Sequence, residues 1–251
     1  MEHGNIVVLG AGESGVGAAV LAQKQGFKVL VSDNQNIKEK VKNVLSQSEI
    51  EFEEGKHSEA RVLAADEVIK SPGIPDEVPL IRKLKEKGIA VISEIEFAAR
   101  YTQGKLICIT GSNGKTTTTL LTHHILKSAG LDACLAGNVG NSFALEVAKA
   151  DHAYFVLEIS SFQLDGMYDF KADIAILMNI SPDHLDRYGH SFERYADSKF
   201  RILRNMTEGD AFIYCQDDPV IMERIRNSSI RPAQYPFSLN SIGNREGAGI
   251  K

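Results

Sequence analysis

A glycine loop at residues 110–117 is the segment of this sequence whose residue types most clearly allow chemistry. It reads Thr-Gly-Ser-Asn-Gly-Lys-Thr-Thr and directly follows a short apolar run. In such a loop, backbone N–H groups surround phosphates, Lys115 neutralises phosphate oxygens, and the Thr116 hydroxyl can hold Mg²⁺. A standard P-loop has a further glycine at the position of Ile109, so a shorter variant is required here. We therefore predict a phosphate loop made of Gly111, Ser112, Asn113, Gly114, Lys115, Thr116 and Thr117.

Two further polar groups follow apolar runs in the same half of the chain. Glu158 comes directly after the run 153–157, and carboxylate oxygens are suitable Mg²⁺ ligands. His184 lies in a polar segment that follows the run 174–178. Ligands of parallel α/β sheets bind at the carboxyl ends of strands, so we expect both side chains near the phosphate loop. The alternatives are a strand-capping or lysine-pairing Glu158 and an ordinary loop histidine.

A second glycine loop, from Gly10 to Gly15, matches the dinucleotide fingerprint Gly-x-Gly-x-x-Gly. It follows a predicted strand and opens a predicted helix, and Asp33 comes 23 residues after Gly10 at the end of the next strand. Glycines allow the close approach of a diphosphate to a helix N-terminus. The pattern predicts a nucleotide diphosphate site. It does not distinguish NAD from a UDP-sugar, and a glycine turn used only for packing is the alternative.

The elements that would position these loops alternate between short strands and longer helices, which predicts an α/β fold with parallel sheets. A Rossmann-like N-terminal domain is expected at 1–93, followed by a P-loop-type central domain at 94–251. We predict strands at 6–9, 28–32, 68–70, 90–92, 106–109, 153–157, 174–178 and 211–214. We predict helices at 16–26, 37–47, 77–87, 93–101, 115–128 and 191–206.

Composition excludes several classes of protein. The 251 residues are 43% hydrophobic with a net charge of -5, so the chain can form a core and has no basic field for nucleic acid. The three cysteines are far apart, which favours a reducing, cytoplasmic compartment over a disulfide framework. We expect no membrane partner, because apolar runs are far shorter than the ~18 residues of a membrane span. The first four residues do not resemble a signal peptide.

Four segments together resemble the Mur ligases, which are ATP-dependent amide-bond ligases of bacterial peptidoglycan assembly. They are the phosphate loop, Gly-Asn-Val-Gly at 137–140, Leu-Glu-Ile-Ser-Ser-Phe-Gln-Leu at 157–164, and Asp-His-Leu-Asp-Arg-Tyr at 183–188. Ser-Pro-Gly-Ile-Pro at 71–75, Glu-Ile-Glu-Phe at 94–97 and Ser-Ser-Phe-Gln-Leu at 160–164 are similar to the ligase that joins D-glutamate to UDP-N-acetylmuramoyl-L-alanine. The family's phosphate loop is the shorter variant.

The resemblance implies where the substrate binds. In this family the first domain binds the UDP part of the substrate and not NAD, with its diphosphate at the first glycine loop and its uracil end near the second strand. Two residues of the central domain, Asn138 and Ser160, would also position the substrate. The implied contacts are Gly12, Glu13, Ser14, Gly15, Asp33, Ser71, Pro72, Gly73, Asn138 and Ser160.

The resemblance also implies a mechanism with ATP and Mg²⁺. ATP phosphorylates the alanyl carboxylate, and the amine of D-glutamate displaces phosphate from the resulting acyl phosphate. Lys115 would hold the β- and γ-phosphates, and Thr116 and Glu158 the first Mg²⁺. His184 and Lys199 would hold a second Mg²⁺, with Lys199 carbamylated by CO₂ because an ammonium group cannot ligate a cation. Spacing alone would make Lys199 an ordinary solvated helix residue.

Family members have a third domain, and this sequence ends in what resembles a turn entering a further strand at 244–251. We therefore expect the 251 residues to bind the UDP-substrate as a monomer and to have little ligase activity alone. Three alternatives remain. They are another Mur-type or folylpolyglutamate-type amide ligase, an NAD-binding oxidoreductase built on the first glycine loop, and a non-catalytic binding module.

Overall fold

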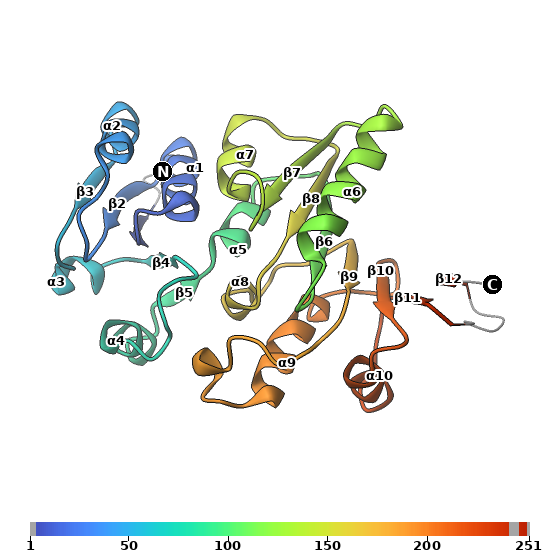
Figure 1. Cartoon of the computed structure of the whole chain (residues 1–251). Coiled ribbons are helices and arrows are strands. Elements are labelled where there is room, and N and C mark those ends of the chain that lie inside the picture. Colours follow the sequence, from blue (N-terminus) through green and yellow to red (C-terminus); the bar gives the residue numbers. More distant parts are fainter. Residues whose placement is uncertain (1–3, 241–245, 250–251) are drawn as a thin grey trace. The chain divides into compact units, whose positions relative to one another are not determined.

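The structure is a computed structural model that describes residues 4–240 and 246–249 (Figure 1). The chain divides into two compact units. The N-terminal unit takes the chain up to Thr102 together with Gly140–Asp151 and Gly166–Tyr168, and the central unit takes the remainder. This division differs from the predicted one at residue 93, because helix α5 (Glu94–Ala99) buries its apolar side chains in the N-terminal unit.

The N-terminal unit contains a parallel sheet whose strands lie in the order β3-β2-β1-β4-β5. Strands β1, β2 and β4 are apolar and mostly buried, as expected for a parallel sheet. In this order the carboxyl end of β1 lies between the carboxyl ends of β2 and β4. The first glycine loop, which follows β1, is therefore flanked by the segments that follow β2 and β4. The bounds are β1 Asn5–Leu9, β2 Lys28–Ser32, β3 Glu51–Glu53, β4 Glu67–Lys70 and β5 Ala90–Ile92.

The helices of this unit include one contributed from far along the chain. Helix α7 packs on α1 so closely that a Cβ on Gly17 would lie 1.8 Å from the Ser142 hydroxyl oxygen. The Lys24 ammonium also donates a hydrogen bond of 2.6 Å to the carbonyl oxygen of Ala148. The bounds are α1 Glu13–Lys24, α2 Glu39–Gln47, α3 Glu59–Val62, α4 Pro79–Glu86 and α7 Phe143–Lys149.

The central unit is built on a second parallel sheet with the order β12-β11-β10-β9-β6-β8-β7 in the described residues (Figure 1). Strand β6 lies between β8 and β9, so the phosphate loop is flanked by Glu158 and by the segment after β9. The strands are β6 Lys105–Thr110, β7 Ala133–Gly137, β8 Tyr154–Glu158, β9 Ile174–Leu177, β10 Ala211–Cys215, β11 Ala233–Ser238 and β12 Ala248–Gly249. The helices are α6 Lys115–Ser128, α8 Ser161–Asp165, α9 Phe192–Phe200 and α10 Pro219–Arg226, with 3-10 turns η1 Leu185–Tyr188 and η2 Arg201–Leu203.

The predicted fold class is confirmed, with differences at element ends. Helix α1 begins at Glu13 and not at 16, and the helix predicted at 191–206 ends at Phe200 and continues as η2. Strand β12 lies within the predicted strand at the chain end, while residues 1–3, 241–245 and 250–251 lie outside the described ones. No helix of the described part is both long and apolar enough to cross a membrane.

Candidate functional site

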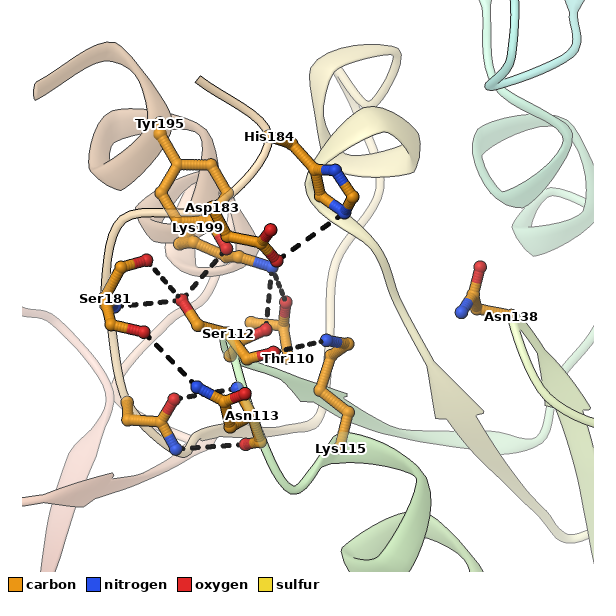
Figure 2. A network of polar contacts seen from close by, with 12 residues as sticks. Thr110, Ser112, Asn113, Lys115, Asn138, Ser181, Asp183, His184, Tyr195 and Lys199 are labelled. Atoms are coloured by element: carbon orange, nitrogen blue, oxygen red, sulfur yellow. Dashed lines mark hydrogen bonds and ion pairs between the residues drawn. The ribbon is translucent and has the colours of Figure 1, made fainter. Parts of the chain in front are cut away.

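The phosphate loop depends on two glycines with left-handed backbone angles. Gly111 has φ +150°, and a Cβ there would lie 2.9 Å from the Cβ of Met178. Gly114 has φ +81° and immediately precedes α6. Only glycine adopts such angles without strain, so the loop can turn tightly and direct the first N–H groups of α6 toward an anion. Lys115 opens α6, and its ammonium donates to the Ser112 carbonyl oxygen at 3.0 Å (Figure 2).

The two residues between these glycines attach the loop to the segment after β9. The Ser112 hydroxyl donates to the Ser181 carbonyl oxygen at 2.9 Å and accepts from the Tyr195 hydroxyl and the Ser181 N–H, each also at 2.9 Å (Figure 2). The Asn113 N–H donates to the Asn179 side chain at 2.9 Å, and Asn179 donates back to the Asn113 carbonyl oxygen at 3.0 Å. The side chain of Ser112 therefore anchors the loop and does not face a phosphate.

A hydroxyl and a carboxylate lie together beside the loop. The Thr116 hydroxyl donates to Glu158 Oε2 at 2.7 Å, and the side-chain amide of Asn138 donates to Glu158 Oε1 at 2.7 Å. Glu158 is buried, with an exposed fraction of 2%. These hard oxygens fit Mg²⁺ that takes its remaining ligands from phosphate and water. The described residues contain no group of three His, Cys, Asp or Glu that could hold a metal. Asn138 positions Glu158.

Lys199 is a buried amine directly behind the loop. It lies on α9 with an exposed fraction of 2%, and its ammonium donates to the Gly111 carbonyl oxygen at 2.9 Å and to the Thr110 hydroxyl at 3.3 Å (Figure 2). Burial, together with the nearby positive charge of Lys115, lowers the pKa of Lys199 to about 7. Much of this side chain is thus a neutral, nucleophilic amine near neutral pH. The solvated lysine expected from helix spacing alone is wrong.

Three further residues predicted for the central-unit site are His184, Ser160 and Thr117. His184 is exposed, has an unusual φ of +50°, and brings its Nε2 to 3.5 Å from the Asp183 carboxylate (Figure 2). Ser160 and Gln163 form a capping box at the start of α8, because each side chain bonds the other's backbone N–H. Thr117 is exposed on α6.

The N-terminal unit holds a cavity of about 620 Å³ at the carboxyl edge of its sheet. The Asp33 carboxylate supports its rim by accepting hydrogen bonds from the N–H groups of Ala11 at 2.7 Å and Gln35 at 2.8 Å. A Cβ on Gly15 would lie 1.9 Å from a backbone oxygen, so this glycine keeps α1 against β1 and does not line the cavity. The predicted residues that do line it are Gly12, Glu13, Ser14, Asp33, Ser71, Pro72 and Gly73.

Several residues at these sites were not predicted as site residues. Asn179, Ser181 and Tyr195 hold the phosphate loop, and His57 lines the cavity. Asn179 and Ser181 follow strand β9, and that position could have indicated them. Tyr195 and His57 carry no sequence signal, because each reaches its site only through the tertiary fold.

Two parallel sheets, each with a glycine loop between its first strand and the following helix, define an α/β protein with two candidate phosphate-binding loops. A family model described as "Mur ligase middle domain" matches residues 109–246. A second model, "Mur ligase MurD-like, N-terminal domain", matches residues 4–93. The chain therefore belongs to the Mur ligase family.

The curated relatives agree with this assignment. The chain is 60% identical to UDP-N-acetylmuramoylalanine--D-glutamate ligase of Bacteroides fragilis, covering 93% of this chain and 52% of that protein. The protein of the same name in Porphyromonas gingivalis is 56% identical, with coverages of 94% and 53%. The chain thus spans about half the length of these curated relatives.

Two solved structures share the fold at low sequence identity. The UDP-N-acetylmuramate:L-alanyl-gamma-D-glutamyl-meso-diaminopimelate ligase of Neisseria meningitides matches with a TM-score of 0.64 at 17% identity, covering 93% of this chain and 78% of that one. The UDP-N-acetylmuramate-alanine ligase of Thermotoga maritima matches with a TM-score of 0.58 at 22% identity, with coverages of 95% and 53%.

Proposed function

We propose that this chain forms the substrate- and ATP-binding part of a ligase that joins D-glutamate to UDP-N-acetylmuramoyl-L-alanine with hydrolysis of ATP to ADP. The hydrogen-bonded Thr116–Glu158 pair beside Lys115 carries the proposal, because it combines a cation site with a phosphate site. The names and identities of the relatives support the choice of substrates.

The central unit would carry out the activation step. The γ-phosphoryl group of ATP passes to the alanyl carboxylate, and the amine of D-glutamate then displaces phosphate to form the amide bond. The N–H groups at the start of α6 and the Lys115 ammonium neutralise the phosphate oxygens during both steps. Mg²⁺, when bound, would offset phosphoryl charge, with Thr116 and Glu158 as its protein ligands and Asn138 holding the carboxylate in place.

Lys199 would contribute through a carbamate. Its neutral amine attacks CO₂ and loses one proton, so the product is an anionic N-carboxylate. A pKa of about 7 supports this role, because the amine must be uncharged to react. The carbamate, together with His184, would provide ligands for a second Mg²⁺, which neither the ammonium form nor a single imidazole would hold well.

The N-terminal unit would hold the UDP moiety in its 620 Å³ cavity. The glycine loop at the start of α1 would offer backbone N–H groups to the diphosphate, and the Ser71–Gly73 segment lines the same cavity. Cavities of this size are typical of sites for ligands as large as a nucleotide. NAD would use the same loop, so NAD binding is the alternative to be tested.

Calorimetric titration with ATP and Mg²⁺ tests the central-unit site. We expect Glu158→Gln and Lys115→Ala each to weaken binding about tenfold or more, because each removes a charge that faces the phosphates or their cation. Lys127→Ala is the matched control, since Lys127 is an exposed lysine in the last turn of the same helix, α6. Equal affinity in all four proteins would refute the proposed site.

Three parts of the proposal concern the protein in solution and in the cell. A monomeric state and a cytoplasmic location stay predictions. The three cysteines, which form no disulfide, support the cytoplasmic location. Weak ligase activity of the 251 residues alone also stays a prediction. D-Glutamate-dependent phosphate release by this chain would contradict it.

A further inference from the structure

The helices of the central unit cover the two faces of its sheet unequally. The connection from β6 to β7 crosses the sheet in one direction, whereas those from β8 to β9, β9 to β10 and β10 to β11 cross it in the opposite direction (Figure 1). Because crossovers between parallel strands are right-handed, α6 lies on one face, and α8, α9 and α10 lie on the other. Parallel sheets normally carry helices on both faces, so the face with α6, which we call the α6 face, is sparsely covered.

The α6 face is buried beneath α6 and half-exposed beside it. Ile109 and Val156 pack in the cluster under the helix and are fully buried. The strand register places Ile176, Ile213 and Tyr235 in one row with Ile109 across β9, β10 and β11, and these three side chains are only half-buried. Together with the other half-buried residues of this face they form what we call the open strip, whose further members are Ile174, Ala211, Cys215 and Phe237.

The same strands are fully covered on their other face. Leu177 on β9 and Phe212 and Tyr214 on β10 alternate with the members of the open strip and are at most 2% exposed. The exposure is therefore confined to the α6 face. The open strip spans three strands, which is about 10 Å at ~4.8 Å between neighbours. An α-helix with its side chains is about 10–12 Å wide, so the strip has room for one helix.

Helix α6 presents apolar side chains beside the open strip. Its side toward β7 is marked by His123, whose Nε2 lies 3.3 Å from the carbonyl oxygen of Ala133. Leu121 and Ile125 lie roughly 160° around the helix from His123, because successive residues are about 100° apart. They are 55% and 56% exposed and form an i,i+4 ridge on the flank away from β7. Large apolar side chains exposed next to each other indicate a surface that another element covers.

We propose that the open strip and the ridge of Leu121 and Ile125 are the docking surface of one amphipathic helix, supplied by polypeptide that the curated relatives have and this chain does not. This chain covers 52% and 53% of two such relatives, so about half of each is available to provide the helix. The helix would bury its apolar stripe on the strip and contact the ridge at the usual interaxial distance of about 8–10 Å. A second copy of this chain is the competing occupant.

Maleimide labelling of Cys215 tests whether the strip is open and what covers it. The 251-residue chain is compared with the same chain joined to the part of the Bacteroides fragilis relative that it does not span. Cys215 should react readily in the first protein and about tenfold more slowly, or less, in the second, because the docked helix must open before the thiol can react. Peptide mass spectrometry follows each cysteine separately. Cys134, half-buried on the other face of β7, is the internal control and should react equally in both proteins.

Ile125→Lys provides an independent measurement. In the 251-residue chain it changes an exposed side chain and should shift the Tm by less than about 2 °C. In the joined protein it places an ammonium group in a buried apolar contact and should lower the Tm of the central unit by about 5 °C or more. Tyr168→Lys, at an exposed position of the N-terminal unit, is the matched control and should have the same effect in both proteins.

Three results would overturn the inference. If Cys215 of the 251-residue chain reacts as slowly as the buried Cys108, the strip is not open, whatever the joined protein does. If Cys215 reacts equally in both proteins and both tolerate Ile125→Lys, no helix docks there. If the 251-residue chain sediments as a dimer that Ile125→Lys dissociates, the occupant is a second copy. None of these measurements depends on ligase activity or nucleotide binding, so their failure is distinct from failure of the proposed function.

Discussion

The buried carboxyl group of Glu94 should make the stability of the N-terminal unit depend on pH. Its side chain is 2% exposed at the start of α5. One carboxyl oxygen accepts a hydrogen bond from the N–H of Ala144, and the other has no partner among the described residues. Burial raises the pKa of Glu94 from 4.5 to about 7, and the hydrogen bond from Ala144 offsets only part of this effect.

The direction and the size of the effect follow from this difference. Because the pKa is higher in the folded chain, the stability from the bound proton is fully present below pH 4.5 and is lost as the pH rises to about 7. One pKa unit corresponds to about 1.4 kcal/mol, so the complete loss is about 3 kcal/mol. Glu94→Gln imitates the protonated group at every pH. It should lie within about 1 kcal/mol of wild type at pH 5 and be about 3 kcal/mol more stable at pH 8.

Urea unfolding of both proteins at pH 5 and pH 8 measures this difference. Comparison of the two proteins at each pH cancels the contribution of every other titrating group. Glu86→Gln, an exposed position on α4, is the matched control and should change stability equally at both pH values. If the gain from Glu94→Gln is the same at pH 5 and pH 8, the buried carboxyl is not protonated in the folded chain and the reasoning is refuted.

Three further predictions follow from the two sites. Carbamylation of Lys199, measured by ¹³C NMR with ¹³CO₂, should increase between pH 6 and pH 8 because its pKa is about 7, and a carbamate signal that persists in Lys199→Met would assign it to another amine. Gly15→Ala should cost about 3 kcal/mol in thermal unfolding because its Cβ would lie 1.9 Å from a backbone oxygen, whereas Gly12→Ala meets nothing within 4 Å and should be neutral. Asn138→Ala should raise the Mg²⁺ concentration needed for ATP binding about tenfold, since Glu158 loses the donor that orients it, and an unchanged requirement would remove Asn138 from the site.

Strong local patterns allowed much of the fold to be predicted from sequence. The helix at 115–128 and the strands at 28–32 and 90–92 have the predicted bounds, because a glycine loop or a β-branched run marks them clearly. Strand β7 was missed because Ala133–Gly137 consists mainly of small residues with no β-branched run. Helix α7 could not be assigned to the N-terminal unit from sequence, because its packing against α1 joins residues more than a hundred positions apart.

Site residues could be predicted from the sequence where the type of side chain itself indicates a single chemical role. Lys115, Thr116 and Glu158 lie together at the sheet edge, as the strand-end argument expects. Burial of Lys199 was not predictable from helix spacing, because the surface that covers it comes from the loop after β6. His57 was overlooked for a related reason. The strand before it, Glu51–Glu53, is short and acidic, so the sequence offered no reason to place the following loop at a ligand site.

The proposed function requires the first glycine loop to bind a UDP-substrate. Calorimetric titration of the 251-residue chain with UDP-N-acetylmuramoyl-L-alanine, with NAD as the control ligand, measures this binding. We expect saturable binding of the UDP ligand and no binding of NAD. Binding of NAD without binding of the UDP ligand would refute the proposed function.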